Sequence, residues 1–503
     1  MLNSFIKKLL KISLTVTLLS VQLTLLAAGV SINVKPELLK EPFTGRVYVV
    51  IAPKSEKAQP LQANYWFSPV EIIAKEVKAW SGKTPLVVSR NDIRYIKPTG
   101  SADTEYAMQV LLRINTRDAN PFGSLNNIYS STIALSAEQH KNLNIKVMAD
   151  QVITVDSALA SKRPPTSEQL IYKAFESNLL SEFHEQPYFV DMAIRLPKNF
   201  KQEPTKTWPV LFYISGMGGS EVEFLRLTKN REAYFDEMIT VSVNAMNYGG
   251  HSVFVNSANT GPWASMLIKE VATYVDENYR GRGAKERYLT GISSGGWSSL
   301  WLQVKYPTDF AGTWSFVPDP VDFRDFQRLN LYADKQNYYT DNLGEDRLVA
   351  RTSKGMPLIK SRDFITLENA LGEGGQIRSF EYVFSPKGED GLPTPFFDRL
   401  TGSINSEVAD AWKPYDIRLH LKNNWLFIKD DLKGKLNVYA GEKDQFFLEG
   451  AVRLLKEQMT YLGAEEDIRI IEGMTHAFDD DAVMQMLKTI TSKEDIPEPA
   501  VSN

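Results

Sequence analysis

The pattern of apolar and polar positions changes along the chain, and residues 44–157 show mostly the two-residue period of strands. Between residues 106 and 114 every even position is apolar, as in a strand with one buried face. One segment, residues 69–80, has apolar side chains at helical spacing and is predicted to form a helix. We therefore expect a small β-rich, sandwich-like domain over 44–157. Its strands are expected at residues 46–51, 85–88, 106–114 and 152–155.

From about residue 164 to residue 495 the pattern changes to alternating strands and helices. Such alternation predicts an α/β domain with a mainly parallel sheet that is covered by helices on both faces. Its strands are expected at residues 190–196, 209–215, 238–243, 288–290, 313–317 and 436–440, and its helices at 262–279 and 297–305. Residues 318–424 are rich in Asp, Asn, Tyr and Gly with few regular signals. This stretch is expected to be a lid-like insertion, because long structureless loops are uncommon in compact domains.

The N-terminal 29 residues have the features of a secretory signal peptide. Lys7, Lys8 and Lys11 precede an apolar run over residues 12–28, which ends in small residues. An uncleaved membrane anchor is the alternative. Cleavage is favoured by the Ser and Thr residues within the apolar run and by the small residues at its end. We therefore expect a periplasmic or secreted protein with no stable membrane span after cleavage. Loss of the three lysines changes the net charge from −4 to −7.

The composition excludes several kinds of catalytic and binding site. The chain has no cysteine, which excludes a thiol nucleophile, a disulfide framework and a cysteine-ligated metal. Lys and Arg number 57 against 61 acidic residues, so no basic excess indicates nucleic acid as a partner. No His, Asp and Glu cluster has the spacing of metal ligands, so neither a metal nor an organic cofactor is expected. The oligomeric state stays open.

A nucleophile elbow is the strongest motif. Gly291-Ile-Ser293-Ser-Gly295 follows the predicted strand at 288–290 and precedes the predicted helix at 297–305. This is the G-x-S-x-G pattern in its required context of strand, sharp turn and helix, where the serine hydroxyl projects from the edge of the sheet. The helix N-terminus also supplies N–H groups near a developing oxyanion. Ser293 is therefore the expected nucleophile.

A glycine-rich loop follows the apolar strand at 209–215 and contains Ser215-Gly-Met217-Gly-Gly. In this position before an elbow, the loop is expected to supply one half of an oxyanion hole. The N–H groups of Met217 and Ser294 are the predicted donors. The loop lacks the lysine and spacing of a phosphate-binding loop.

Two residues near the C-terminus complete a triad in the chain order Ser, acid, His. Asp444 follows the predicted strand at 436–440, and His476 lies in a loop after a short apolar run. His476 would accept the Ser293 proton, and Asp444 would orient the imidazole. Asp319, after the strand at 313–317, is the alternative acid. His251, on a glycine-rich loop, is either a residue of the substrate pocket or, against chain order, the base.

These motifs together resemble an esterase family of α/β-hydrolases that includes esterase D, enterobactin esterase and feruloyl esterases. The resemblance covers residues 165–490 and is carried by ISGMGGSE, HSVFVNS with GPW, GISSGG, AGEKD and MTHAF. Residues 44–160 are similar to the β-rich region of some exported bacterial members. The resemblance implies an α/β-hydrolase fold, the triad Ser293, Asp444 and His476, and oxyanion donors at Met217 and Ser294. Many members of the family have His-Gly at the start of this loop. This chain has Ser215-Gly instead, and in this it is similar to the esterase D branch.

The sequence therefore predicts an exported serine hydrolase that cleaves a carboxylic ester, of a small molecule or linked to a carbohydrate, through an acyl-enzyme. A serine peptidase with the same triad is one alternative. The other is a non-catalytic carbohydrate-binding or surface module on the same fold. The triad does not distinguish an esterase from a peptidase, and the identity of the ester stays open.

Overall fold

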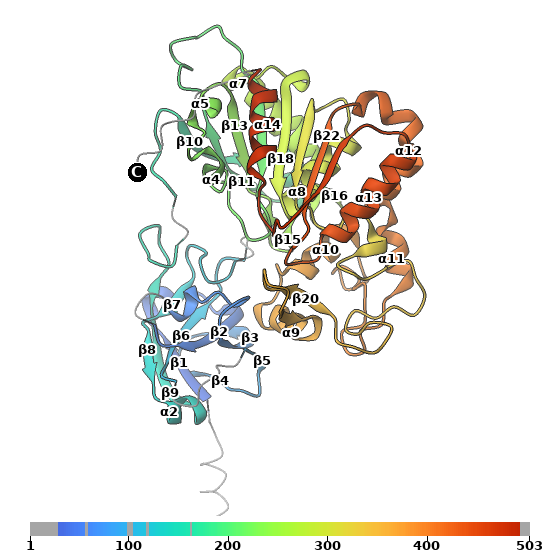
Figure 1. Ribbon diagram of the computed structural model, residues 1–503. Helices are drawn as coiled ribbons and strands as arrows, with labels where there is room; N and C mark the ends of the chain where they lie inside the picture. Colours follow the sequence, from blue (N-terminus) through green and yellow to red (C-terminus); the bar gives the residue numbers. More distant parts are fainter. Residues whose placement is uncertain (1–28, 56–58, 98–103, 117–119, 161–162, 493–503) are drawn as a thin grey trace, which may run out of the picture. The chain divides into compact units, whose positions relative to one another are not determined.

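The computed structural model describes residues 29–55, 59–97, 104–116, 120–160 and 163–492. They form two compact units (Figure 1). The first contains the described residues up to 160 together with residues 369–372, and the second contains the rest. The expected signal peptide lies outside the described residues, except for Gly29, which begins a strand. In the described part of the chain, no helix is long and apolar enough to cross a membrane.

The first unit is built on one nine-stranded sheet. Its order is β4-β1-β9-β7-β6-β2-β3-β5, with β8 paired to β6. Among the described strands of this sheet, only β1 and β9 pair in parallel. The strands are β1 (Gly29–Val34), β2 (Phe43–Pro53), β3 (Val70–Trp80), β4 (Leu86–Val88), β5 (Ile93–Lys97), β6 (Tyr106–Leu112), β7 (Ile128–Ser130), β8 (Ile133–Leu135) and β9 (Asn144–Val152), and a short helix, α2 (Ala137–Lys141), precedes β9.

One face of this sheet carries a large buried cluster. Val88 on β4 and Ile73 on β3 lie far apart in the strand order, yet they belong to one buried cluster, so the sheet curls around it. The described strands of this unit form one curled sheet where a sandwich-like domain was expected, and the first of them, β1, starts at Gly29, upstream of residue 44.

Two of the expected elements in this unit are wrong. The predicted helix over residues 69–80 is the strand β3, which pairs with β2 and β5. Val70 to Ala74 are all buried, so both faces of this strand are covered and its two-residue period is hidden. The β-branched residues Ile72 and Ile73 favour the extended form. The predicted strand at 152–155 is only the end of β9, which stops at Val152.

The second unit contains an eight-stranded mixed sheet of order β10-β11-β13-β12-β18-β19-β22-β23. Only β11 runs against the other strands, because it is antiparallel to both of its neighbours and the remaining pairs are parallel. The strands are β10 (Leu170–Glu176), β11 (Phe189–Arg195), β12 (Val210–Ile214), β13 (Ile239–Val243), β18 (Arg287–Ile292), β19 (Gly312–Phe316), β22 (Leu436–Gly441) and β23 (Asp467–Ile471).

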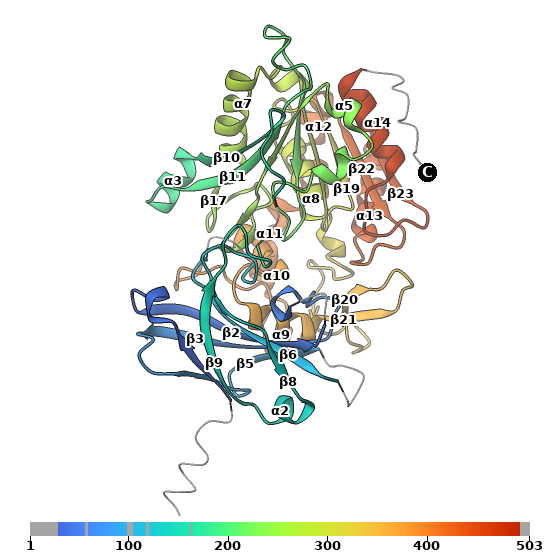
Figure 2. The ribbon, with the colours of Figure 1, turned by 90° about the vertical axis from the view of Figure 1, so that its left-hand side faces the viewer.

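Helices cover both faces of this sheet, as the alternation of strands and helices predicts (Figure 2). Val210 and Phe212 on β12 pack in a core with residues of α7, whereas Leu211 and Tyr213 pack in a second core with residues of α5 and α14. The expected helix at 262–279 forms as one run with a central π turn, Met266–Val271. The helices outside the insertion are α3 (Asn178–His184), α4 (Leu225–Thr228), α5 (Glu232–Phe235), α6 (Trp263–Ser265), α7 (Ala272–Tyr279), α8 (Ser294–Lys305), α13 (Glu449–Tyr461) and α14 (Asp480–Thr491).

The chain between β19 and β22 is far more regular than its composition suggests. Its amphipathic stretches are short and separated by polar loops, so their helical period is hard to recognise in the sequence. An aromatic cluster that includes Phe323, Phe384, Phe396 and Trp412 holds them together. The elements of this region are β20 (Leu348–Arg351), β21 (Pro357–Lys360), α9 (Ser361–Leu371), α10 (Gln376–Phe384), α11 (Ser406–Trp412) and α12 (Ile417–Leu432).

Candidate active site

The turn between β18 and α8 has the geometry of a strained elbow. Ser293 has φ 58° and ψ −124°, a conformation that L-residues with a side chain rarely adopt. Its backbone is fixed on both sides, because its N–H donates to Phe316 O at 3.0 Å and its carbonyl accepts from Asp319 N at 3.2 Å. Strain of this kind persists only where the surrounding structure enforces it, and it is concentrated at functional sites.

The glycines of the motif are required by backbone contacts. A Cβ on Gly295 would lie 2.0 Å from Ile214 O, and a Cβ on Gly291 would lie 2.4 Å from Gly295 O. The start of α8 therefore lies directly against the end of β12, closer than any other residue permits. The partly buried Ser293 side chain stands at this junction.

The loop after β12 forms a tight turn beside the elbow. Gly219 N donates to Gly216 O at 3.0 Å and Gly218 has φ +74°, as expected at the third position of a type II turn. A Cβ on Gly216 would lie 3.3 Å from Ser293 Cβ. Met217 is therefore next to the expected nucleophile. Among the residues that the structure describes, neither Met217 N–H nor Ser294 N–H donates to a protein acceptor.

His251 is hydrogen-bonded to the start of this loop. It is 1% exposed, and its Nε2 donates to Ser215 O at 3.0 Å while its Nδ1 accepts from Val253 N at 2.9 Å. Burial lowers the pKa of His251 to about 4, so the ring is neutral at physiological pH. Both ring nitrogens are used by the backbone, which leaves none for Ser293. His251 thus contacts the start of the loop after β12 and does not have the contacts of a base.

Asp444 and His476 meet at the same edge of the sheet. Asp444 is fully buried, and its Oδ2 accepts from His476 Nδ1 at 2.7 Å. Its Oδ1 accepts from Phe446 N at 2.8 Å, so both carboxylate oxygens have donors. This geometry keeps a proton on Nδ1 and leaves Nε2 as the free acceptor of the imidazole. His476 and Ser293, both among the described residues, share no direct hydrogen bond.

The loops that carry this pair are fixed by backbone contacts. A Cβ on Gly441 would lie 2.4 Å from both Met474 O and Thr475 O, so the glycine lets the His476 loop approach the end of β22. Arg351, from β20 of the insertion, donates through Nε to Asp444 O at 2.8 Å. The insertion therefore helps to place the acid.

Asp319 provides a second carboxylate group beside Ser293. It is 5% exposed, and its Oδ2 accepts from Ser294 Oγ at 2.5 Å and from Gln376 Nε2 at 3.2 Å. Its Oδ1 faces Ser293 Oγ at 3.5 Å. Burial raises the pKa of Asp319 to about 6, and the charge of His476 opposes that rise. Asp319 thus contacts the serine itself and has no hydrogen bond to His476.

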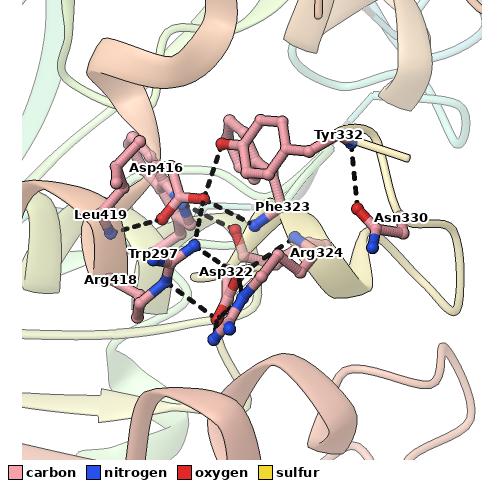
Figure 3. Close-up of polar contacts among 10 residues, drawn as sticks. Trp297, Asp322, Phe323, Arg324, Asn330, Tyr332, Asp416, Arg418 and Leu419 are labelled. Carbon is pink, nitrogen blue, oxygen red and sulfur yellow. Dashed lines mark hydrogen bonds and ion pairs between the residues drawn. The ribbon is translucent and has the colours of Figure 1, made fainter. Parts of the chain in front are cut away.

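A buried charge cluster fixes the loop that follows Asp319 (Figure 3). Asp322 is fully buried and accepts from Arg418 Nε at 3.1 Å and from Arg324 Nη2 at 2.6 Å. Asp416 is also fully buried, and it accepts from Phe323 N at 2.9 Å and from the Tyr332 hydroxyl at 2.7 Å. These bonds join the loop after β19 to the N-terminus of α12, so they connect the start of the segment between β19 and β22 to its last helix.

The structure thus brings Ser293, Met217, Asp444, His476 and Asp319 to one edge of the sheet. Two contributors were missed by sequence analysis: Gln376 at the start of α10 and Arg351 on β20. Neither belongs to a motif, and both reach the site only through the packing of the insertion. Within the described ranges, no group of three His, Asp or Glu residues could hold a metal ion.

A family model described as "Putative esterase" matches residues 189–482, more than half of the chain. The chain belongs to this family, and it is a carboxylic ester hydrolase with an α/β-hydrolase-like fold in its second unit. This is the family that the sequence motifs resemble, and its members act on small-molecule esters. No curated protein matches the chain significantly.

Several solved structures are similar to part of the chain. A ferulic acid esterase is 15% identical, with a TM-score of 0.38, and the match covers 64% of this chain and 97% of the other. An S-formylglutathione hydrolase from Agrobacterium tumefaciens is 14% identical, with a TM-score of 0.38 and coverages of 64% and 94%. A fluorophosphonate-binding serine hydrolase from Staphylococcus aureus is 14% identical, with a TM-score of 0.40 and coverages of 64% and 98%.

Proposed function

We propose that this enzyme is an exported serine esterase that works through an acyl-enzyme. The observation that supports it best is the 2.7 Å bond between the buried Asp444 and His476, at the sheet edge where Ser293 occupies a strained elbow. An acid that orients a histidine near a serine at an elbow is the arrangement that activates a hydroxyl for attack on a carbonyl.

In the proposed reaction, the Ser293 hydroxyl attacks the ester carbonyl and His476 Nε2 accepts its proton. The N–H groups of Met217 and Ser294, which have no protein acceptor in the described structure, stabilise the oxyanion of the tetrahedral intermediate. His476 then returns the proton to the leaving alcohol. Water, activated by the same imidazole, releases the acid from Ser293. Asp444 keeps the imidazole in the required tautomer and stabilises its charged form.

The test combines a fluorophosphonate probe with hydrolysis of 4-nitrophenyl acetate. Wild-type protein is expected to be labelled once and to release a stoichiometric burst of nitrophenol, since an acyl-enzyme accumulates. Ser293→Ala should lose both signals. Ser406→Ala, which changes an exposed serine at the start of α11, is the matched control and should keep both.

Labelling of Ser293→Ala at the wild-type rate would contradict the assignment of the nucleophile. Absence of labelling and of turnover in the wild type would favour the non-catalytic module. Peptide amides tested beside the esters separate esterase from peptidase. Export is tested by expressing the full chain in a bacterium and sequencing the N-terminus of the protein recovered from the periplasm and the medium.

A further inference from the structure

The two oxygens of the Asp319 carboxylate have different surroundings. Oδ2 is anchored by two donors, the Ser294 hydroxyl at 2.5 Å and the Gln376 amide at 3.2 Å. Among the described residues the one hydrogen-bond partner of Oδ1 is Ser293 Oγ, at 3.5 Å, which is well beyond the usual O–H···O distance of about 2.7 to 2.8 Å. A buried carboxylate oxygen normally has close donors, so Oδ1 has unused capacity to accept a hydrogen bond at the nucleophile.

The position of Oδ1 limits which group of the substrate can donate a hydrogen bond to it. Once Ser293 is acylated, an atom on the carbon next to the carbonyl is only three covalent bonds from Oγ, in the same range as the Oδ1–Oγ separation. Of the other groups on the tetrahedral carbon, the oxyanion faces the Met217 and Ser294 N–H groups and the leaving oxygen must face His476. The acyl chain is the remaining substituent, so it is the group that can approach Oδ1. Asp319 has no hydrogen bond to His476, which would face the leaving oxygen.

The charges around Asp319 also favour a hydrogen-bond donor on the substrate. Ser294 and Gln376 are neutral, and the ionisable groups that act on Asp319 are His476 and Asp444, which are bonded to each other. In the described structure Asp319 has no ion pair with Lys or Arg within 4.0 Å. A buried carboxylate without such a partner is costly, and a donor from the substrate lowers that cost.

We propose that Asp319 selects esters whose acyl group carries a hydrogen-bond donor, a hydroxyl or an ammonium group, on the carbon next to the scissile carbonyl. This selection rests on the proposed serine esterase mechanism. Asp319 is then a specificity-determining residue, and Gln376 is its positioning residue, supplied by the insertion.

The experiment compares phenyl esters of (R)-lactate, (S)-lactate, L-alanine and propionate at pH 7, where the Asp319 carboxyl carries its charge and the amino group of the alanine ester is still largely protonated. Rates are divided by the active sites titrated with a fluorophosphonate, so partly misfolded variants remain comparable. The two lactate enantiomers have the same intrinsic reactivity, so a difference between them comes from the enzyme. The lactate arms report a hydroxyl donor and the alanine arm reports an ammonium donor.

Wild-type enzyme should prefer one lactate enantiomer and L-alanine over propionate in kcat/KM. In Asp319→Asn this preference should fall by about 10- to 100-fold, the range for a hydrogen bond to a charged group. The amide oxygen of this variant is kept at the Oδ2 position by the Gln376 donor, so the new NH2 group takes the place of Oδ1 and cannot accept. Gln376→Met should show a smaller fall. Glu223→Gln neutralises a carboxyl beside Gly219 and should keep the preference.

Preference ratios that are unchanged in Asp319→Asn would overturn the proposal, and so would a loss that is equal for all four esters. Turnover of propionate in the wild type, with no preference for the substituted esters, would overturn this inference and leave the esterase function standing. Failure of the wild type on all four esters and on the probe would overturn both.

Discussion

Neutralising Asp319 should stabilise the protein in a pH-dependent way. Burial raises the pKa of this carboxyl from 3.8 to about 6. Between these values the folded protein keeps a proton that the unfolded chain has released, so the contribution of Asp319 to stability falls as pH rises from about 4 to 6. A rise of about two pKa units corresponds to about 3 kcal/mol. Asp319→Asn has no such titration.

The measured quantity is the difference in the free energy of unfolding between Asp319→Asn and wild type. We expect it to rise by about 3 kcal/mol in favour of the variant between pH 4 and pH 7. For a unit of this size the gain corresponds to a rise of about 4 °C in Tm. Hydrogen bonds lost on substitution shift this difference by a constant and do not change its dependence on pH. Glu368, whose pKa burial raises to about 7, titrates in both proteins and cancels.

Denaturant and thermal unfolding at pH 4, 5, 6 and 7 measure the difference, and Asp390→Asn, at an exposed carboxyl, is the control. If the two units unfold separately, the change should be confined to one transition. A difference that is constant with pH, or that falls as pH rises, would show that Asp319 is not held as an uncompensated buried carboxyl.

Substitutions at four further residues test the site. Asp444→Asn should lower kcat roughly 10⁴-fold with little change in KM, measured with 4-nitrophenyl acetate, because the imidazole tautomer is reversed. Gly295→Ala should prevent native folding, seen by circular dichroism, since its Cβ would lie 2.0 Å from a carbonyl oxygen. His251→Phe should lower kcat about 100-fold by releasing the oxyanion loop, whereas His251→Gln should recover part of that loss. Arg418→Met should lower the free energy of unfolding by about 3 kcal/mol in denaturant melts, because it leaves Asp322 without its buried partner.

Opposite results would each identify a specific error. A large loss in Asp319→Asn, with a mild one in Asp444→Asn, would make Asp319 the acid of the triad. Soluble, active Gly295→Ala would mean that α8 does not lie against β12 as described. Equal activity of His251→Phe and wild type would separate His251 from the oxyanion loop, and an unchanged melt of Arg418→Met would mean that the charge cluster contributes little.

The sequence predicted the elements of the site whose requirements are local. The elbow needs glycines two residues on either side of Ser293, and the turn before it needs Gly218 at positive φ, so both leave a short signal. Asp444 lies three residues after the end of the buried strand β22, which places it at the sheet edge. The alternation of strands and helices likewise indicated the α/β unit.

Other features depend on tertiary packing and left no such signal. Gln376 reaches Asp319 across 57 residues of sequence, and nothing near it distinguishes it from other polar residues. The strand β3 is buried on both faces, so its pattern resembles that of a helix. Strand β1 lies beside a predicted signal segment, and only its pairing with β4 and β9 shows that it belongs to the fold.

The insertion between β19 and β22 limits which segments can be exchanged between related enzymes. Its Gln376 bonds to Asp319, which contacts Ser293, and its Arg351 bonds to the backbone of Asp444, which pairs with His476. A chimera that takes this segment from another esterase would change the environment of the nucleophile together with the substrate pocket. Recombination should therefore succeed only where these two contacts are transplanted with it, and designed libraries should vary the remainder of the segment around them.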